Sequence, residues 1–330
     1  MPADFPGRRP TRREFLTIGT GLFVALSLPL SLRHRVRLVR RSYPLMGTIA
    51  ELQVAHADER VAEDAIDAAL AELLRVERTM TRFRGDSDIG RANLGAAREG
   101  IAISAETALV VEAALRWASA SDGRFDPALG SASELWDVLH RHEPPAAGQV
   151  ARLASRGFWR KVDLSREGGG ARIRFEDREV HLDLGGIAKG YGIDQATTAL
   201  RRRGIAHALV TVGGDLFALG HAPDGAPWQV GIRDPHQLDR LAGRLAVADR
   251  AVTTSGDYER FFTWHGLRYH HLMDPETAAP RRTPMRSVTV VGGDCMNADA
   301  AATAVFGLAP DAAQRVARRL LAGADVIPLT

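Results

Sequence analysis

The chain has 330 residues, of which 45% are hydrophobic and 25% are charged, a composition typical of a globular protein with a sizeable core. The formal net charge of +3 is unevenly distributed. Residues 1–41 carry nine arginines and two acidic residues, whereas the remaining 289 residues hold 34 basic and 38 acidic side chains. Because the excess of positive charge belongs to the N-terminus, composition gives no electrostatic basis for nucleic-acid binding.

The N-terminal 41 residues have the pattern of a targeting segment. Thr11-Arg12-Arg13-Glu14-Phe15-Leu16 resembles the twin-arginine export motif, and residues 16–32 are uncharged. We therefore divide the chain into a targeting segment at 1–41 and one folded unit at 42–330, exported to the periplasm or cell envelope. An uncleaved anchor helix that tethers the protein to the membrane is the alternative, although 17 residues is short for a span. The only cysteine, Cys295, lies too late for a lipid anchor and excludes an internal disulfide.

Beyond residue 41, hydrophobic periodicity predicts helices and strands that alternate without regular βαβ spacing. This pattern favours an α+β fold over a doubly wound sheet, and we expect one two-lobed domain. Ser104 is expected to cap the second helix. The predicted strands are 49–54, 171–175, 179–184, 208–212, 228–232, 245–247 and 287–291, the predicted helices are 61–80, 105–119, 189–203 and 311–321, and 140–148 is a loop.

The segment Asp183-Leu184-Gly185-Gly186-Ile187-Ala188-Lys189 is typical of a ligand-binding turn. Two glycines before a helix let the backbone approach a ligand and direct helix N–H groups at a phosphate. A tight structural turn would look similar. Lys189 favours the binding interpretation, since the chain has only two lysines and an ammonium group suits a phosphate.

Asp299 and Thr303 stand four residues apart, so on a helix their oxygens share a face. A carboxylate and a hydroxyl suit Mg²⁺, which prefers hard oxygen ligands. The alternative is an N-capping aspartate with a threonine that bonds back to the helix.

Two other motifs are weaker indications. His270 and His271 would point to opposite faces of a strand, so at most one of them can serve a site on one face. Gly213-Gly214-Asp215 follows a strand and is consistent with a structural turn. No Gly-x-Gly-x-x-Gly stands at a strand–helix junction, which is evidence against a Rossmann dehydrogenase.

Taken together and in order, these motifs resemble the ApbE family of flavin transferases over nearly all of residues 43–308. No single motif is decisive, but the motifs occur together in register. The matching segments are Tyr43–Thr48 with Met46, Glu77–Phe83, Ser87-Asp88-Ile89, Asn93, Ser121–Pro127, Leu135-Trp136, Asp183–Tyr191, Gly213-Gly214-Asp215, Pro227-Trp228, Thr254–Tyr258, His271–Pro275 and Asp299–Thr303.

The resemblance implies a T-fold-like α+β architecture and a residue for each role. His271 takes the position of the proposed catalytic histidine, and Asp299, Thr303 and the carbonyl of Gly186 take those of the metal ligands. Two positions depart from the usual family pattern: Phe83 replaces a commoner tyrosine, and Ala278 replaces a glycine. The residues expected at the FAD site are Met46, Phe83, Arg124, Phe125, Asp126, Asp183, Lys189 and Leu272.

The activity implied by the resemblance is the Mg²⁺-dependent transfer of FMN from FAD to a threonine hydroxyl of an acceptor protein, with release of AMP. The acceptor is expected to be an exported or membrane flavoprotein. Two alternatives remain open at this stage. One is a FAD pyrophosphatase that gives FMN and AMP, and the other is a flavin-binding accessory protein without turnover.

Replacing both Arg12 and Arg13 by lysine should leave the precursor in the cytoplasm, because the export motif requires the arginine pair. Immunoblots of periplasmic and cytoplasmic fractions measure the distribution, with the same change at Arg8 and Arg9 as the control. Unchanged periplasmic levels in the Arg12→Lys, Arg13→Lys double variant would mean that another route exports the protein.

Overall fold

A computed structural model describes residues 23–25 and 36–330 of the chain. Most of the predicted targeting segment at 1–41 therefore lies outside the described residues. None of the helices within the described ranges has both the length and the apolar character needed to cross a membrane.

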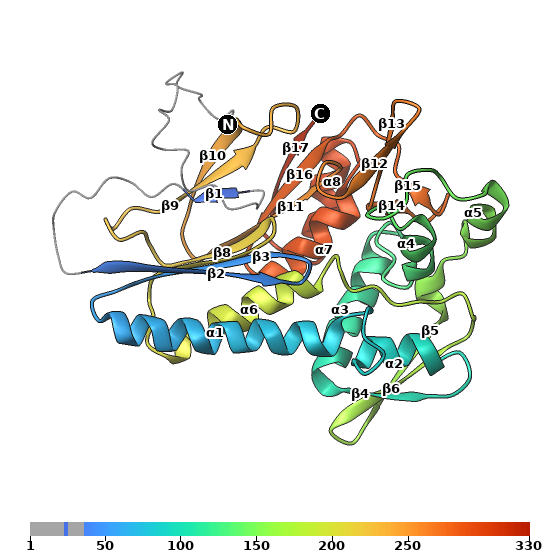
Figure 1. Cartoon of the computed structure of the whole chain (residues 1–330), viewed down its shortest axis with the longest axis horizontal. Coiled ribbons are helices and arrows are strands. Elements are labelled where there is room, and N and C mark those ends of the chain that lie inside the picture. The colour runs from blue at the N-terminus through green and yellow to red at the C-terminus, as the bar shows by residue number, and fades with distance from the viewer. Residues whose placement is uncertain (1–22, 26–35) are drawn as a thin grey trace.

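The centre of the fold is a seven-stranded antiparallel sheet in the order β17-β16-β11-β8-β7-β3-β2 (Figure 1). It is continuous because β3 pairs with β7, which joins the N-terminal hairpin to the strands of the C-terminal half. Its strands are β2 (Arg37–Leu45), β3 (Thr48–His56), β7 (Ala208–Val212), β8 (Asp215–Leu219), β11 (Arg250–Gly256), β16 (Ser287–Gly292) and β17 (Asp325–Leu329).

The two faces of the sheet are covered by different elements. Helices α1 (Glu59–Met80), α6 (Ala188–Arg202) and α7 (Cys295–Val305) cover one face, with α8 (Pro310–Arg318) beside α7 (Figure 1). A small sheet of β1 (Phe23–Ala25), β9 (Trp228–Arg233) and β10 (Leu241–Val247) packs against the other. The alternation along β8 fits this arrangement, since Phe217 joins the helical core whereas Leu216 contacts the cluster around Trp228.

A second group of elements packs beside the end of α1, on the right of Figure 1. Helix α3 contacts α7 and joins this group to the main sheet. The group consists of α2 (Asp88–Gly95), β4 (Ile101–Ser104), α3 (Ala105–Ala120), α4 (Gly130–Trp136), α5 (Ala147–Leu153), the 3-10 turn η2 (Phe158–Lys161), β5 (Val162–Glu167) and β6 (Gly170–Phe175). Two hairpins stand above it, β12 (Phe261–Trp264) with β13 (Leu267–His270) and β14 (Met273–Asp274) with β15 (Ala279–Pro280).

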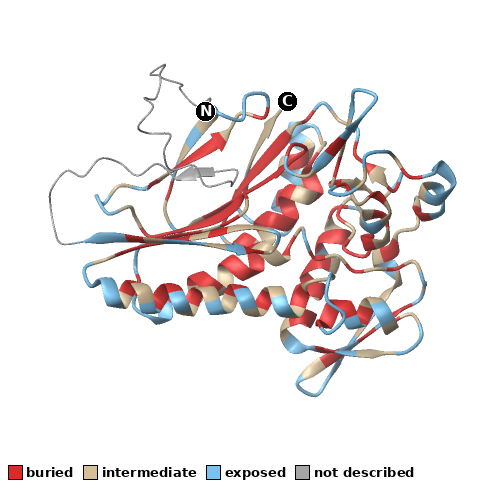
Figure 2. Cartoon of the chain, in the orientation of Figure 1, coloured by how far each residue is buried: buried red, intermediate tan, exposed pale blue. Residues whose placement is uncertain are grey.

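Helix α7 is buried along most of its length, as Figure 2 shows. Five alanines among its 11 residues let the neighbouring elements approach closely. The closest approach is to α6, where a Cβ added to Gly190 would lie 2.1 Å from the carbonyl oxygen of Cys295. Glycine is therefore required at this crossing.

The structure confirms the mixed α and β composition and most predicted elements. Helix α1 matches the prediction at 61–80, and Ser104 Oγ accepts the N–H of Thr107 as the predicted cap of α3. The predicted strand at 179–184 is wrong, because β5 and β4 already pair with both edges of β6 and leave only an isolated bridge at His181. The predicted loop at 140–148 ends earlier, where α5 begins at Ala147.

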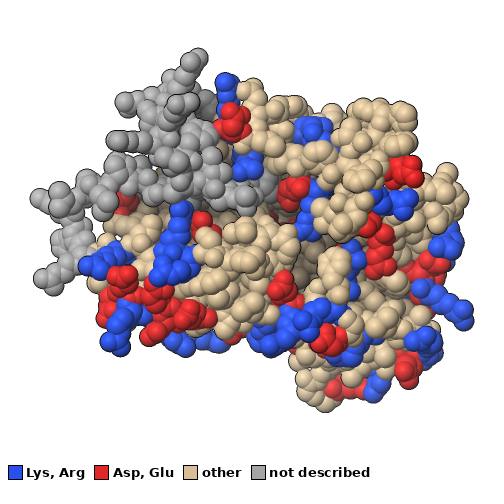
Figure 3. Space-filling view, viewed as in Figure 1, with Lys and Arg blue, Asp and Glu red and all other residues tan. Residues whose placement is uncertain are grey.

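Charged side chains of both signs are interspersed on the face drawn in Figure 3. Many charged side chains of the described residues are paired, such as Arg37 with Glu59 and Arg166 with Glu112. The described residues drawn on this face form no continuous basic surface of the kind that binds nucleic acid.

Gly190→Ala should destabilise the protein by about 1–3 kcal/mol or more, because the added methyl meets backbone rather than a movable side chain. The midpoint of urea unfolding measures the effect. Gly148→Ala on α5 is the matched control: its Cβ would meet nothing within 4 Å, so its midpoint should stay or rise slightly. Equal midpoints for the two variants would contradict the close α6–α7 contact.

Candidate active site

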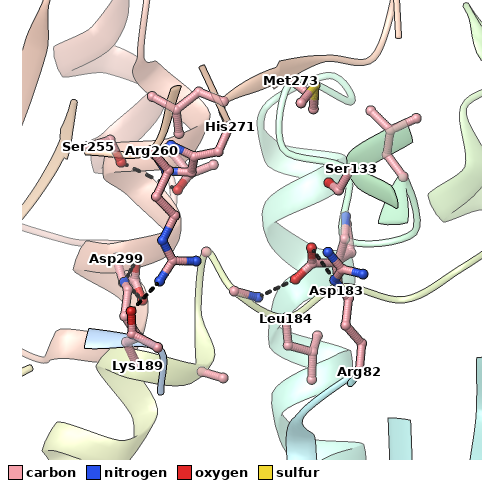
Figure 4. Close-up of a pocket in the computed structure, with 18 of the residues that line it drawn as sticks. Arg82, Ser133, Asp183, Leu184, Lys189, Ser255, Arg260, His271, Met273 and Asp299 are labelled. Atoms are coloured by element: carbon pink, nitrogen blue, oxygen red, sulfur yellow. Dashed lines mark hydrogen bonds and ion pairs between the residues drawn. The ribbon is translucent and has the colours of Figure 1, made fainter. Parts of the chain in front are cut away.

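A cavity of about 430 Å³ opens between the central sheet and the second group of elements. Figure 4 shows its two walls, with His271, Arg260 and Asp299 on one side and Arg82, Asp183 and Ser133 on the other. All twelve residues singled out from the sequence line this cavity. They come from loops, from the first turn of α6 and from helix α7, between positions 46 and 303, so the fold brings them together.

Lys189, in the first turn of α6, lies between two buried carboxylates. Its ammonium group bonds Asp215 of β8 and lies 3.1 Å from both carboxylate oxygens of Asp299. Burial raises the pKa of Asp299 to about 7, although Lys189 opposes the shift. The two carboxylates raise the pKa of Lys189, which remains charged. Sequence analysis treated Gly213-Gly214-Asp215 as a structural turn, but Asp215 also holds this lysine.

Three oxygen donors fit the expected metal site. A carboxylate has about four lone-pair positions. The ammonium group of Lys189 occupies one lone-pair position on each carboxylate oxygen of Asp299, and the N–H of Gly190 donates to Oδ2 at 3.1 Å. One lone-pair position on Oδ1 therefore remains for a metal. Thr303 lies one turn further along α7, and a Cβ on Gly186 would lie 3.0 Å from its hydroxyl oxygen.

Among residues 36–330 no three His, Cys, Asp or Glu side chains gather in the geometry of a metal cluster. The expected ligand set contains a single carboxylate, so it would not form such a cluster. Carboxylate, hydroxyl and carbonyl oxygens are the donors that Mg²⁺ takes when substrate phosphates and water complete its shell. The residues present therefore fit a magnesium ion.

The adjacent histidines have different surroundings. His270 is buried, and both its ring nitrogens serve the backbone: Nε2 lies 3.0 Å from the carbonyl oxygen of Arg281, and Nδ1 accepts the N–H of Leu272. His271 lines the cavity, and its buried Nδ1 has no hydrogen-bond partner among the described residues. Burial, and secondly the charge of Arg260, lower the pKa of His271 to about 3. The imidazole is therefore neutral, and one of its nitrogens is buried without a partner among the described residues.

On the opposite wall, Asp183 organises the glycine turn. Its Oδ1 accepts the N–H of Gly185 at 2.9 Å, and its Oδ2 accepts the Nε–H of Arg82 at 3.0 Å (Figure 4). The guanidinium of Arg82 in turn lies 4.3 Å from the ring centroid of Phe83. Phe83 is 77% exposed at the cavity, so a planar ring has room to stack on it.

Met46 reaches the cavity from the β2–β3 turn. It has φ of 52° and Gly47 has φ of 68°, the pair of positive values that a two-residue hairpin turn requires. A methionine rarely adopts this conformation, and here the carboxylate of Glu77 accepts its N–H at 2.6 Å. Glu77 therefore holds Met46 in place.

The segment 124–126 lines the cavity, but its polar groups serve the fold as well. Arg124 donates to the carbonyl oxygens of Ala304 and Phe306 at the end of α7. Asp126 accepts the N–H of Ala128 at 2.9 Å, and burial raises its pKa to about 6. These contacts leave Phe125 and the backbone as the surfaces that a ligand would meet here.

Two arginines that sequence analysis missed shape the cavity. Arg260 lines it directly, two residues beyond the family-like segment 254–258. Arg281 is 6% exposed and donates to the carbonyl oxygens of Thr303, Phe306 and Arg124. Burial and the nearby Arg124 lower the pKa of Arg281 to about 9. No local pattern in the sequence identified either one.

Comparison with known proteins agrees with this geometry. The model of the ApbE family matches residues 46–327. Two relatives, each named FAD:protein FMN transferase, come from Treponema pallidum and Vibrio cholerae. The first is 34% identical and the match covers 84% of this chain and 80% of the relative; the second is 32% identical and the match covers 84% of each.

Solved structures of ApbE proteins also align with most of this chain. The ApbE protein of Thermotoga maritima aligns with a TM-score of 0.78 at 27% identity, covering 88% of this chain and 96% of that one. The flavin transferase ApbE of Vibrio cholerae aligns with a TM-score of 0.74 at 28% identity, covering 89% and 93%. With a family model that matches most of its length and a cavity lined by all twelve residues expected at the site, the chain belongs to the ApbE family.

Proposed function

We propose that this chain is a transferase that moves FMN from FAD to a hydroxyl of an acceptor protein, with Mg²⁺ at Asp299 and Thr303. The observation that carries this proposal is the arrangement of one cavity: a fixed lysine, a carboxylate–hydroxyl pair and a neutral histidine all line it. The names of the relatives give the transfer of FMN from FAD to a protein, which supports the first part of this proposal.

The flavin and the pyrophosphate would lie at different ends of the cavity. Phe83, Met46 and Leu272 offer apolar surfaces suited to the ring system. Lys189, Asp299, Thr303 and the N-terminus of α6 form the polar end, where helix N–H groups favour phosphate. The reacting phosphorus would therefore lie near His271 on the polar side.

The metal would be held by Asp299, Thr303 and the carbonyl of Gly186. When bound there, Mg²⁺ would neutralise charge on the pyrophosphate as AMP departs. Lys189 does not replace this charge, because two carboxylates already surround it. Its contribution is to orient Asp299 so that the remaining lone pair faces the cavity.

His271 is the proposed general base that accepts the proton of the attacking hydroxyl. A pKa near 3 makes the free imidazole weakly basic, and a pyrophosphate close by would raise it by compensating the charge of Arg260. His270 is unsuited to this role, because the backbone engages both its ring nitrogens.

The acceptor and the compartment are parts of the same proposal. We propose that the acceptor is an exported or membrane flavoprotein carrying a target threonine, and that the twin-arginine segment brings the chain to the periplasm or cell envelope. A pathway that exports folded proteins suits an enzyme with a nucleotide pocket. Incubation with FAD, Mg²⁺ and candidate acceptors, followed by intact-mass measurement, tests the reaction. FMN and AMP without acceptor modification would indicate a pyrophosphatase instead.

Asp299→Ala should abolish AMP release from FAD while the protein stays folded, and excess EDTA should abolish it in the unaltered protein. Two substitutions at Thr303 distinguish the role of its hydroxyl as a metal ligand from its role in packing. Thr303→Ser keeps the hydroxyl and should keep most of the activity. Thr303→Val keeps the shape of the side chain without the hydroxyl and should lose most of the activity. Chromatography of AMP measures turnover. Full activity in EDTA, or in Thr303→Val, would rule out this metal site.

His271→Ala should lower turnover by about 10²–10⁴ with FAD affinity largely kept, since a base acts in the transition state. His270→Ala should instead lower the free energy of unfolding by about 1–3 kcal/mol, because two buried backbone partners lose their bonds. Single-turnover rates and urea unfolding distinguish the two effects. Equal loss of turnover in both variants would show that the base is misassigned.

A further inference from the structure

The positively charged residues of the cavity differ in how far their charges are already compensated. Lys189 bonds two carboxylates, and Arg82 bonds Asp183 and Glu134. Arg124 is directed at the carbonyl oxygens that end α7. Arg260 likewise forms no ion pair with any carboxylate of residues 36–330, and it differs from Arg124 in donating a single hydrogen bond, from Nη2 to the carbonyl oxygen of Gly47 at 3.2 Å.

The position of Arg260 is well defined. It follows β11 and directly precedes β12, and its own carbonyl oxygen accepts the N–H of His271 at 3.1 Å. Figure 4 shows its guanidinium extending from the His271 wall toward Lys189 and Asp299. A guanidinium has five N–H donors in a planar fork, so most of them remain available to a ligand.

The cavity also carries a carboxylate, Asp299, that an anionic ligand must overcome. Glu259 lines the same side and precedes Arg260 in the chain, but burial raises its pKa to about 8 and it forms no ion pair with Arg260. A pyrophosphate that enters therefore needs a cation that is not already neutralised. Arginine matches phosphate oxygens with two parallel bonds, which also fixes their orientation.

We propose that Arg260 binds the pyrophosphate of FAD and orients the phosphorus toward His271. This inference deepens the proposed FMN transfer and rests on it for the identity of the ligand. The contact with Gly47 holds the guanidinium at the cavity, and the backbone bond to His271 keeps the histidine and the phosphate-binding group at a fixed separation.

FAD and riboflavin share the flavin ring, but riboflavin has no phosphate, so the two ligands separate phosphate binding from ring binding. We expect Arg260→Gln to raise the Kd for FAD by about 10- to 100-fold, the range for loss of hydrogen bonds to a charged group, and to leave the Kd for riboflavin unchanged. Arg260→Lys keeps the charge but not the planar fork of donors. Its Kd for FAD should therefore lie between the values for Arg260→Gln and for the unaltered protein. Quenching of flavin fluorescence measures both constants.

Arg84→Gln is the matched control, because it removes the same charge from an arginine that is paired with Asp86 outside the cavity lining. Its Kd for FAD should stay within about twofold of the unaltered protein. If riboflavin binds too weakly to measure, the salt dependence of the Kd for FAD decides, and its slope should fall in Arg260→Gln but not in Arg84→Gln.

The outcomes separate the two proposals. Failure of the unaltered protein to bind FAD would overturn the proposed function itself. Normal FAD binding that Arg260→Gln leaves unchanged, or an equal loss for FAD and riboflavin, would overturn only the role of Arg260.

Discussion

The structure depends on one buried ionic contact, the ammonium group of Lys189 between the carboxylates of Asp215 and Asp299. It ties α6, β8 and α7 together at the point where Gly190 lets the two helices approach. Removal of Lys189 would be strongly destabilising, by about 3–5 kcal/mol, because both carboxylates would stay buried without a positive charge. Loss of Asp299 alone still leaves Asp215 to compensate the lysine. The contact that holds the helices together also sets the orientation of the carboxylate offered to the cavity, so stability and the proposed chemistry share these residues.

Helix α7 is fixed at both ends. At its start the carboxylate of Asp194 accepts the N–H groups of Cys295 and Met296, at 2.8 and 2.9 Å, and Asp294 caps Asn297. At its end the guanidinium groups of Arg124 and Arg281 bond the free carbonyl oxygens, where positive charge is favourable. A helix held in this way presents Asp299 and Thr303 with little freedom, which a metal site requires.

The contacts that stabilise the fold also determine which charges in the cavity are compensated. Arg82, Arg124 and Lys189 are occupied by carboxylates or helix carbonyl oxygens, so they shape the walls more than they attract a ligand. Arg260 keeps a largely uncompensated charge, and its proximity lowers the pKa of His271. Binding of an anion would compensate the charge of Arg260 and so remove the second of the two causes that lower the pKa of His271, of which burial is the larger.

The sequence by itself determined most of the elements, and its resemblance to a family indicated twelve of the residues at the cavity. The spacing of apolar residues in α1, the cap at Ser104 and the i, i+4 relation of Asp299 and Thr303 are local, so they could be read without the fold. Only the tertiary structure decided which partners each side chain meets. Strands β4 and β5 pair with both edges of β6, and backbone groups bond both nitrogens of His270. Among the described residues, Arg124 bonds the carbonyl oxygens that end α7, whereas Arg260 bonds only the carbonyl oxygen of Gly47. These outcomes depend on contacts between segments far apart in the chain, and no local pattern encodes such contacts.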